Sequence, residues 1–158
     1  VTGVQTCALP IYYKNQPLEF VFPKRFTGKI LKNNNKINAA IIREKGSNSE
    51  REMAYMMSLS GFNVKDVHMT DIISGRENLE DIKLLVAVGG FSNSDVLGSA
   101  KGWAGSFIYN KKAKQTLNNF FNRDVSMSLG VCNGCQLFIE LGLINNNHDE
   151  KQIGRAHV

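Results

Sequence analysis

Short apolar runs alternate along this chain with segments whose apolar residues recur at helical spacing. Residues 39–42, 83–88 and 126–131 form nearly continuous apolar runs, and residues 63–69 alternate between apolar and polar side chains. Continuous runs of this length are typical of strands covered on both faces. Because segments that can be helical follow the strands, the pattern predicts an α/β fold in which a parallel sheet is flanked by helices.

Two segments carry the helical pattern most clearly. Two pairs at the start of the first fit a capping box: Ser47 with Glu50, and Ser49 with Glu52. Gly61 stands where a helix of that length would end. The methionines of this helix recur at helical spacing and are expected to pack into the core rather than to bind a ligand: Met53, Met56 and Met57. The second segment, residues 103–122, is expected to add a helical layer over the sheet.

Both ends of the chain carry sequence that resembles translated adapter oligonucleotide rather than protein. These stretches are residues 1–11 (VTGVQTCALPI) and residues 153–158 (IGRAHV), and a matching string at each end is hard to explain by chance. We therefore expect the natural part to end at residue 152. Within it, residues 12–36 hold two prolines and a stretch of asparagine and lysine and are expected to be a connector, followed by a partial domain over residues 37–152.

Composition and charge exclude several classes of protein. The chain has three cysteines, and because Cys7 falls in the adapter-like stretch, only Cys132 and Cys135 remain, too few for a secreted disulfide framework. The net charge of +5 is carried by dispersed lysines instead of one basic stripe, which argues against nucleic-acid binding. No apolar run reaches the ~18 residues that span a bilayer. We expect a soluble, cytoplasmic protein with neither nucleic acid nor membrane as a partner.

Residues 126–142 (SMSLGVCNGCQLFIELG) carry the clearest chemical signal. An apolar run leads through G-V-C-N-G (residues 130–134) directly into a segment with the composition of a buried helix, which is the G-x-nucleophile-x-G pattern of a nucleophile elbow. Cys132 is the predicted nucleophile, and the flanking glycines avoid collisions at the sharp strand-to-helix turn. The N-terminus of the following helix favours a thiolate at Cys132, and the Asn133 N–H is expected to point at an oxyanion.

The same segment also fits a C-x-x-C pattern through Cys132 and Cys135, as a redox pair or half of a zinc site. A tetrahedral zinc site needs further ligands, and neither His68 nor His148 has a second histidine nearby. A thioredoxin-like pair is expected near the start of its domain rather than after three strands. The elbow interpretation is therefore favoured, with no metal and with Cys135 as a helix residue packed in the core.

A second glycine-rich stretch, residues 86–92 (VAVGGFS), supports the elbow. It resembles a strand ending in paired glycines, where backbone can approach a ligand closely and Gly90 can offer a second N–H to an oxyanion. The simpler interpretation is a tight turn. Because the carboxyl ends of parallel strands meet at one edge of a sheet, this turn is expected beside the elbow.

Five strings resemble, in order, the glutaminase domain of the large, single-chain form of phosphoribosylformylglycinamidine synthase. They are REKGSNS (43–49), DVHMTD (66–71), GGFS with DVLG (89–98), GWA (102–104) and GVCNGCQ (130–136). The elbow alone is similar only to class I glutamine amidotransferases, and the other strings narrow the resemblance to this synthase. Lys45 stands where the family often has glutamine, and Asn93-Ser94 where it often has Tyr-Gly. The resemblance implies the flavodoxin-like class I amidotransferase fold, C-terminally truncated.

The resemblance also implies a mechanism. The Cys132 thiolate would attack the side-chain amide carbon of glutamine, ammonia would leave, and water would release glutamate from the thioester. Gly90 and Asn133 would hold the oxyanion, and Gln136 matches a position that contacts the substrate glutamine. Ammonia would pass to a synthase domain of the same parent chain, which uses ATP and magnesium to aminate formylglycinamide ribonucleotide in purine biosynthesis. No cofactor is expected in this segment.

The family's activating histidine and glutamate follow much further along the chain than this sequence reaches. His148 lies too close behind the elbow helix, and His68 is expected to be a hydrogen-bonded strand-end residue. We therefore expect the polypeptide as given to hydrolyse glutamine negligibly. Three alternatives stay open: another class I amidotransferase subunit, such as a free-standing glutaminase; a hydrolase or isomerase with a cysteine elbow but no ammonia transfer; and a non-catalytic flavodoxin-like binding module.

Overall fold

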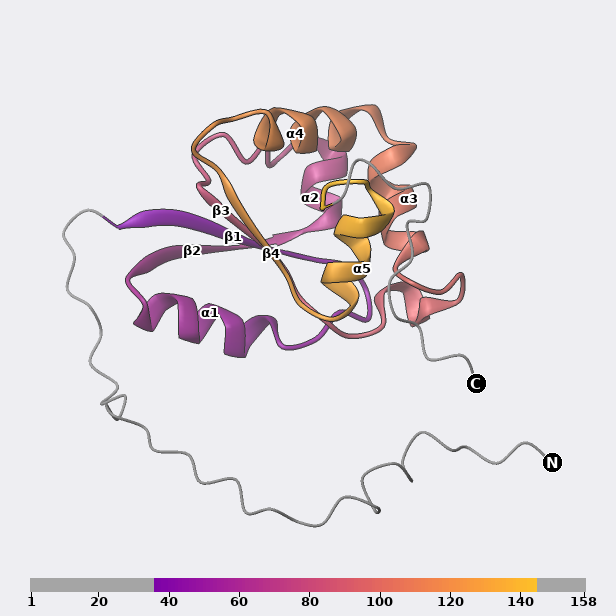
Figure 1. Cartoon of the computed structure of the whole chain (residues 1–158), viewed down its shortest axis with the longest axis horizontal. Helices are drawn as coiled ribbons and strands as arrows, with labels where there is room; N and C mark the ends of the chain where they lie inside the picture. Colours follow the sequence, from indigo (N-terminus) through magenta and orange to yellow (C-terminus); the bar gives the residue numbers. More distant parts are fainter. Residues whose placement is uncertain (1–35, 145–158) are drawn as a thin grey trace, which may run out of the picture. The chain divides into compact units, whose positions relative to one another are not determined.

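Parallel strands form the centre of the computed structural model, which describes residues 36–144 (Figure 1). The sheet has the strand order β2-β1-β3-β4, and every neighbouring pair is parallel. Its strands are β1 (Ile37–Arg43), β2 (Phe62–His68), β3 (Leu84–Ala87) and β4 (Met127–Gly130). This is the order of flavodoxin-like sheets, so the predicted α/β fold is confirmed.

Helices cover both faces of this sheet, with α1 on one face and α2 to α5 on the other (Figure 1). They are α1 (Glu50–Leu59), α2 (Met69–Ser74), α3 (Lys101–Ile108), α4 (Lys111–Phe121) and α5 (Asn133–Glu140), with a short 3-10 turn η2 (Ser92–Asp95). The helical layer predicted over residues 103–122 is two helices. The break falls at Asn110, whose side chain accepts a hydrogen bond from the Ala113 N–H at 2.9 Å and so begins α4.

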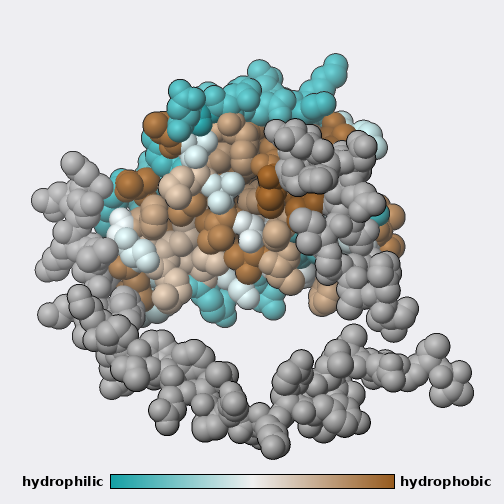
Figure 2. Space-filling model, in the orientation of Figure 1, coloured by the Kyte–Doolittle hydropathy of each residue, from teal (hydrophilic) through white to brown (hydrophobic). Residues whose placement is uncertain are grey.

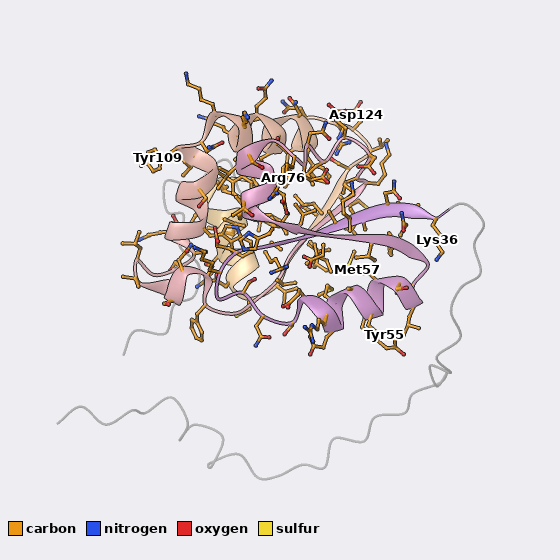
Figure 3. The ribbon with its side chains drawn as sticks, turned by 180° about the vertical axis from the view of Figure 1, so that it is seen from behind. Lys36, Tyr55, Met57, Arg76, Tyr109 and Asp124 are labelled. Carbon is orange, nitrogen blue, oxygen red and sulfur yellow. The ribbon has the colours of Figure 1, made fainter. Side chains whose placement is uncertain are left out.

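Two apolar layers hold the sheet between its helices. The larger layer lies under α2 to α5 and contains the largest buried side chains: Trp103, Phe107, Phe120 and Phe138. On the opposite face Met57 of α1 packs against Ile41 and Val86. Figure 3 shows Met57 pointing from α1 toward the sheet while Tyr55 points away from it. The predicted methionine stripe is therefore correct for Met57 and wrong for Met56, which is 51% exposed.

The start of α1 differs from the predicted capping boxes. Its N-cap residue Ser49 has a φ of 71° and makes no side-chain cap hydrogen bond. The Ser47 hydroxyl instead donates to the Glu44 carbonyl at 2.8 Å, within the turn that follows β1. That turn competes for the Ser47 hydroxyl, which explains why the box with Glu50 does not form. The end of the helix is as predicted, because Gly61 has a φ of 91°, a conformation that favours glycine.

Strand β4 is exposed along most of its length, which corrects the prediction of a strand buried on both faces. Met127 is 72% exposed and Leu129 is 46% exposed. Both pair in register with β3 residues that face α1, but α1 packs over β1 and β2 and does not extend to β4 at the edge of the described sheet. Hydrophobic side chains accordingly gather on the surface around β4 and α5 (Figure 2).

Some predictions concern parts of the chain outside the described residues. These are the adapter-like stretches 1–11 and 153–158, the connector up to residue 35, and His148. Among residues 36–144, none of the helices combines the length and the apolar character that crossing a bilayer requires.

Candidate active site

The loops that follow β1 and β3 lie against each other at the carboxyl edge of the sheet. The Asn48 N–H donates to the Gly89 carbonyl at 2.8 Å, and the Phe91 N–H donates to the Gly46 carbonyl at 2.9 Å. From β1 the chain first builds β2 on one side and then β3 on the other. Open α/β sheets bind ligands at the carboxyl ends of the strands where the strand order reverses in this way. We therefore expect a binding site beside these two loops.

Cys132 lies at the neighbouring turn, between β4 and α5. It is the N-cap residue of α5, with φ 53° and ψ −112°. A positive φ of this kind costs a non-glycine residue about 1–3 kcal/mol of conformational energy. The Val131 N–H still donates to the Ala87 carbonyl of β3 at 2.9 Å, so the strain is confined to the residue after it. The thiol is free and exposed. This is the strand-turn-helix geometry of a nucleophile elbow.

The glycines on either side of Cys132 are required by the packing. A Cβ on Gly130 would lie 2.7 Å from the Cα of Cys135, and one on Gly134 would lie 2.1 Å from the Ala87 oxygen. Both distances are far below van der Waals contact, and both neighbours are backbone atoms that a rotamer change cannot move. The two glycines therefore let α5 begin directly against β3 and fix the position of the thiol.

Gly89, the first of the paired glycines after β3, lies beside that thiol, at the carboxyl edge where the sequence predicted this turn. A Cβ on Gly89 would lie 3.2 Å from the Cβ of Cys132 and 3.9 Å from its Sγ. Gly90 has a φ of 101°, and a Cβ there would lie 2.6 Å from the Gly46 oxygen. Within residues 36–144 the N–H groups of Gly90 and Asn133 donate to no protein acceptor. An N–H group without an acceptor is available to bind a developing oxyanion.

The side chain of Asn133 joins the two loops, a feature that sequence reasoning did not find. Asn133 is 2% exposed, and its Oδ1 accepts hydrogen bonds from the Ser92 N–H at 3.3 Å and the Ser92 hydroxyl at 2.6 Å. Its Nδ2 donates to Gln136 Oε1 at 3.0 Å. Ser92 follows the paired glycines and Asn133 follows Cys132, so this bond fixes one loop to the other.

Cys132 opens into a cavity of about 620 Å³ beside β4 and α5. Its wall includes the predicted substrate contact Gln136 and apolar side chains from Val131, Ile139 and Ile144. Cys135 is half-buried and also faces this cavity, so the prediction that it packs in the core is wrong. The reason is that Cys135 lies one helical turn after Cys132 on the same side of α5.

No base for Cys132 is found among residues 36–144. The Cys132 thiol makes no hydrogen bond within this range. His68 caps α2 instead: its Nδ1 accepts from the Thr70 N–H at 3.2 Å, which confirms that it is a hydrogen-bonded strand-end residue.

Next to His68 in the sheet, Arg43 of β1 donates to Asp66 of β2 at 2.7 Å, and this hydrogen bond raises the pKa of Arg43. Residues 36–144 hold no group of three metal-ligating side chains.

The sequence profile of the CobB/CobQ-like glutamine amidotransferase domain matches residues 36–157. The chain belongs to this family. The resemblance to glutaminase domains is thus confirmed for the amidotransferase domain itself, and every described element falls inside the matched range. Membership of this family supports the glutamine amidotransferase interpretation over the hydrolase and the binding module that the sequence left open.

A solved structure described as PurLQS from Thermotoga maritima has the same fold as this amidotransferase domain. The TM-score is 0.55 at 24% sequence identity, over 70% of this chain and 47% of that one. The chain therefore spans about half the length of that relative. At this identity the likeness establishes the fold, which agrees with the parallel sheet and flanking helices described above.

Proposed function

We propose that Cys132 is the nucleophile that hydrolyses glutamine in this amidotransferase domain. The observation that carries the proposal is the position of its exposed thiol, at the N-terminus of α5 and beside Gly89. A thiolate is the form of cysteine that attacks a carbonyl carbon. The strained elbow places the Cys132 sulfur over the cavity, where the side chain of glutamine can reach it.

The reaction proceeds through a thioester. The sulfur attacks the side-chain carbonyl carbon of glutamine, and the negative charge that develops on oxygen is held by the N–H groups of Gly90 and Asn133. Collapse of this intermediate breaks the C–N bond while the leaving nitrogen takes a proton, the one that the cysteine thiol gave up, and departs as ammonia. Water then attacks the thioester and releases glutamate. Gln136, on the cavity wall, contacts the substrate.

Within residues 36–144 the Cys132 thiol has no hydrogen-bond partner, and His68 caps α2 through Thr70. The resemblance places the activating histidine and glutamate further along the parent chain, so the 158-residue chain by itself is proposed to hydrolyse glutamine negligibly. Appreciable glutaminase activity of this chain that disappears in the Cys132→Ala variant would overturn this part of the proposal.

The wider reaction follows from the sequence resemblance. Ammonia is passed to a synthase domain of the parent chain, joined through residues 12–36, which converts formylglycinamide ribonucleotide to formylglycinamidine ribonucleotide. ATP and magnesium belong to that domain. The fold shared with PurLQS supports this assignment, and a free-standing glutaminase subunit is the alternative.

Covalent trapping tests the assignment of the nucleophile. The chain is treated with a chloromethyl ketone analogue of glutamine, and modified residues are located by peptide mass spectrometry with and without excess L-glutamine. We expect alkylation at Cys132 that glutamine prevents. Cys135→Ser is the matched control and should leave labelling intact, whereas Cys132→Ser should abolish it. Labelling that glutamine does not slow, or that falls on Cys135, would contradict the proposal.

A further inference from the structure

The hydrogen bonds around Asn133 have a direction that the backbone sets. The Ser92 N–H can only donate, so the Asn133 atom that it meets at 3.3 Å must be the oxygen. The other end of the Asn133 amide is then nitrogen, which can only donate to Gln136 at 3.0 Å. This in turn assigns the Gln136 atom facing Asn133 as Oε1. One backbone donor thereby fixes the orientation of two amides that could otherwise be placed either way round.

The outer end of the Gln136 amide is therefore Nε2, a donor. Within residues 36–144 this nitrogen has no hydrogen-bond acceptor, and Gln136 lines the cavity beside Cys132. A group that can only donate favours ligand oxygen atoms, such as those of a carboxylate or of an amide carbonyl. It disfavours a ligand amide nitrogen or ammonium in the same position.

We propose that Asn133 is a positioning residue which, held by Ser92, turns the Gln136 amide so that it donates to an oxygen of the bound glutamine. This inference rests on the proposed function and adds a role that is separate from the Asn133 backbone N–H. Asn133 is only 2% exposed, so water does not compete for its amide. The donor and acceptor of each hydrogen bond between Ser92, Asn133 and Gln136 therefore stay as assigned.

A merely structural role for Asn133 makes a different prediction. If its side chain only joins the loop after β3 to α5, changing it should lower the stability of the chain. It should then also change the alkylation rate of Cys132 to the same extent with every electrophile. If it acts through Gln136, changing it should affect only electrophiles that present glutamine's oxygen atoms. The loss should also vanish once Gln136 is removed.

Asn133→Asp is the informative substitution. The aspartate can still accept both hydrogen bonds from Ser92, but its second oxygen faces Gln136 Oε1, so the Gln136 amide turns and presents an acceptor to the cavity. The readout is the alkylation rate of Cys132 by the chloromethyl ketone analogue of glutamine divided by its rate with iodoacetamide. This ratio cancels any change in thiolate reactivity that the added carboxylate causes. Asn133→Ala, which adds no charge, is the second variant, and thermal melting monitors folding of each.

We expect the ratio to fall about tenfold in Asn133→Asp, the order of one hydrogen bond to a charged ligand group, and less in Asn133→Ala. In a Gln136→Ala background neither change at residue 133 should lower the ratio further. Equal losses with and without Gln136, or an unchanged ratio in both folded variants, would overturn the inference while leaving Cys132 as nucleophile. A wild-type chain without glutamine-protected labelling would instead contradict the proposed function on which it rests.

Discussion

Gly134 lies so close to Ala87 that no side chain fits between helix α5 and strand β3 at this point. A Cβ on Gly134 would be 2.1 Å from the Ala87 carbonyl oxygen and 2.5 Å from its carbon. The elbow therefore depends on this glycine as much as on the cysteine, because any side chain here would push the start of α5 away from the sheet.

Gly134→Ala is expected to lower the free energy of unfolding by about 3 kcal/mol, at the upper end for overpacking because neither partner can move aside. Chemical denaturation of both proteins measures the difference. Gly105→Ala in α3 is the matched control, since its Cβ would find Tyr109 at an ordinary 3.7 Å and alanine favours helix by up to about 1 kcal/mol. Equal stability of Gly134→Ala and the wild type would show that the contact is not as close as described.

Ser94→Gly should stabilise the chain. Ser94 is exposed and has a φ of 57°, in a run of left-handed residues where the resembling family often has glycine. Removing the Cβ relieves about 1–2 kcal/mol, partly offset by the greater freedom of glycine in the unfolded chain, for a net gain of about 0.5–1 kcal/mol. Ser58→Gly, inside α1, should instead lose about 0.5 kcal/mol. The prediction fails if both glycines destabilise the chain alike in thermal unfolding.

Arg123 holds the loop before β3 against α4. Its guanidinium donates to the carbonyls of Glu80 at 2.6 Å, Leu79 at 3.1 Å and Ile82 at 2.8 Å. A lysine cannot reproduce this fork, so Arg123→Lys should cost about 1–3 kcal/mol of unfolding free energy. Arg76→Lys, at a surface ion pair, should change stability by less than about 0.5 kcal/mol. Similar losses in the two variants would show that the Arg123 hydrogen bonds contribute no more than a surface ion pair.

His68 is expected to matter for folding and not for the chemistry of Cys132. Its Nδ1 accepts from the Thr70 N–H and its own N–H donates to Asp71, which together begin α2. His68→Ala should lose about 1 kcal/mol of stability, whereas His68→Asn keeps an acceptor and most of that stability. Alkylation of Cys132 should proceed at the wild-type rate in His68→Asn. A marked slowing there would mean that the histidine assists the thiol.

Local sequence was sufficient to predict the strands and the elbow because their requirements are local. The G-x-C-x-G spacing follows from collisions within a few residues of Cys132, and each buried strand has its own apolar run. The bond between Asn133 and Ser92 could not be predicted in this way, since it joins residues 41 positions apart and depends on the two loops meeting. The exposure of Met127 and Leu129 in β4 was missed because an apolar run does not reveal how far α1 extends over the sheet.

The most direct test of the account compares the two cysteines of one molecule. The chain is treated with limiting iodoacetamide at neutral pH, and the rates at Cys132 and Cys135 are followed by peptide mass spectrometry. Because Cys132 is exposed at a helix N-terminus and Cys135 is half-buried inside the helix, we predict that Cys132 reacts about ten times faster or more. Equal rates, or a Cys132 rate no higher than that of a cysteine in an unstructured peptide, would contradict the assignment of Cys132 as the nucleophile.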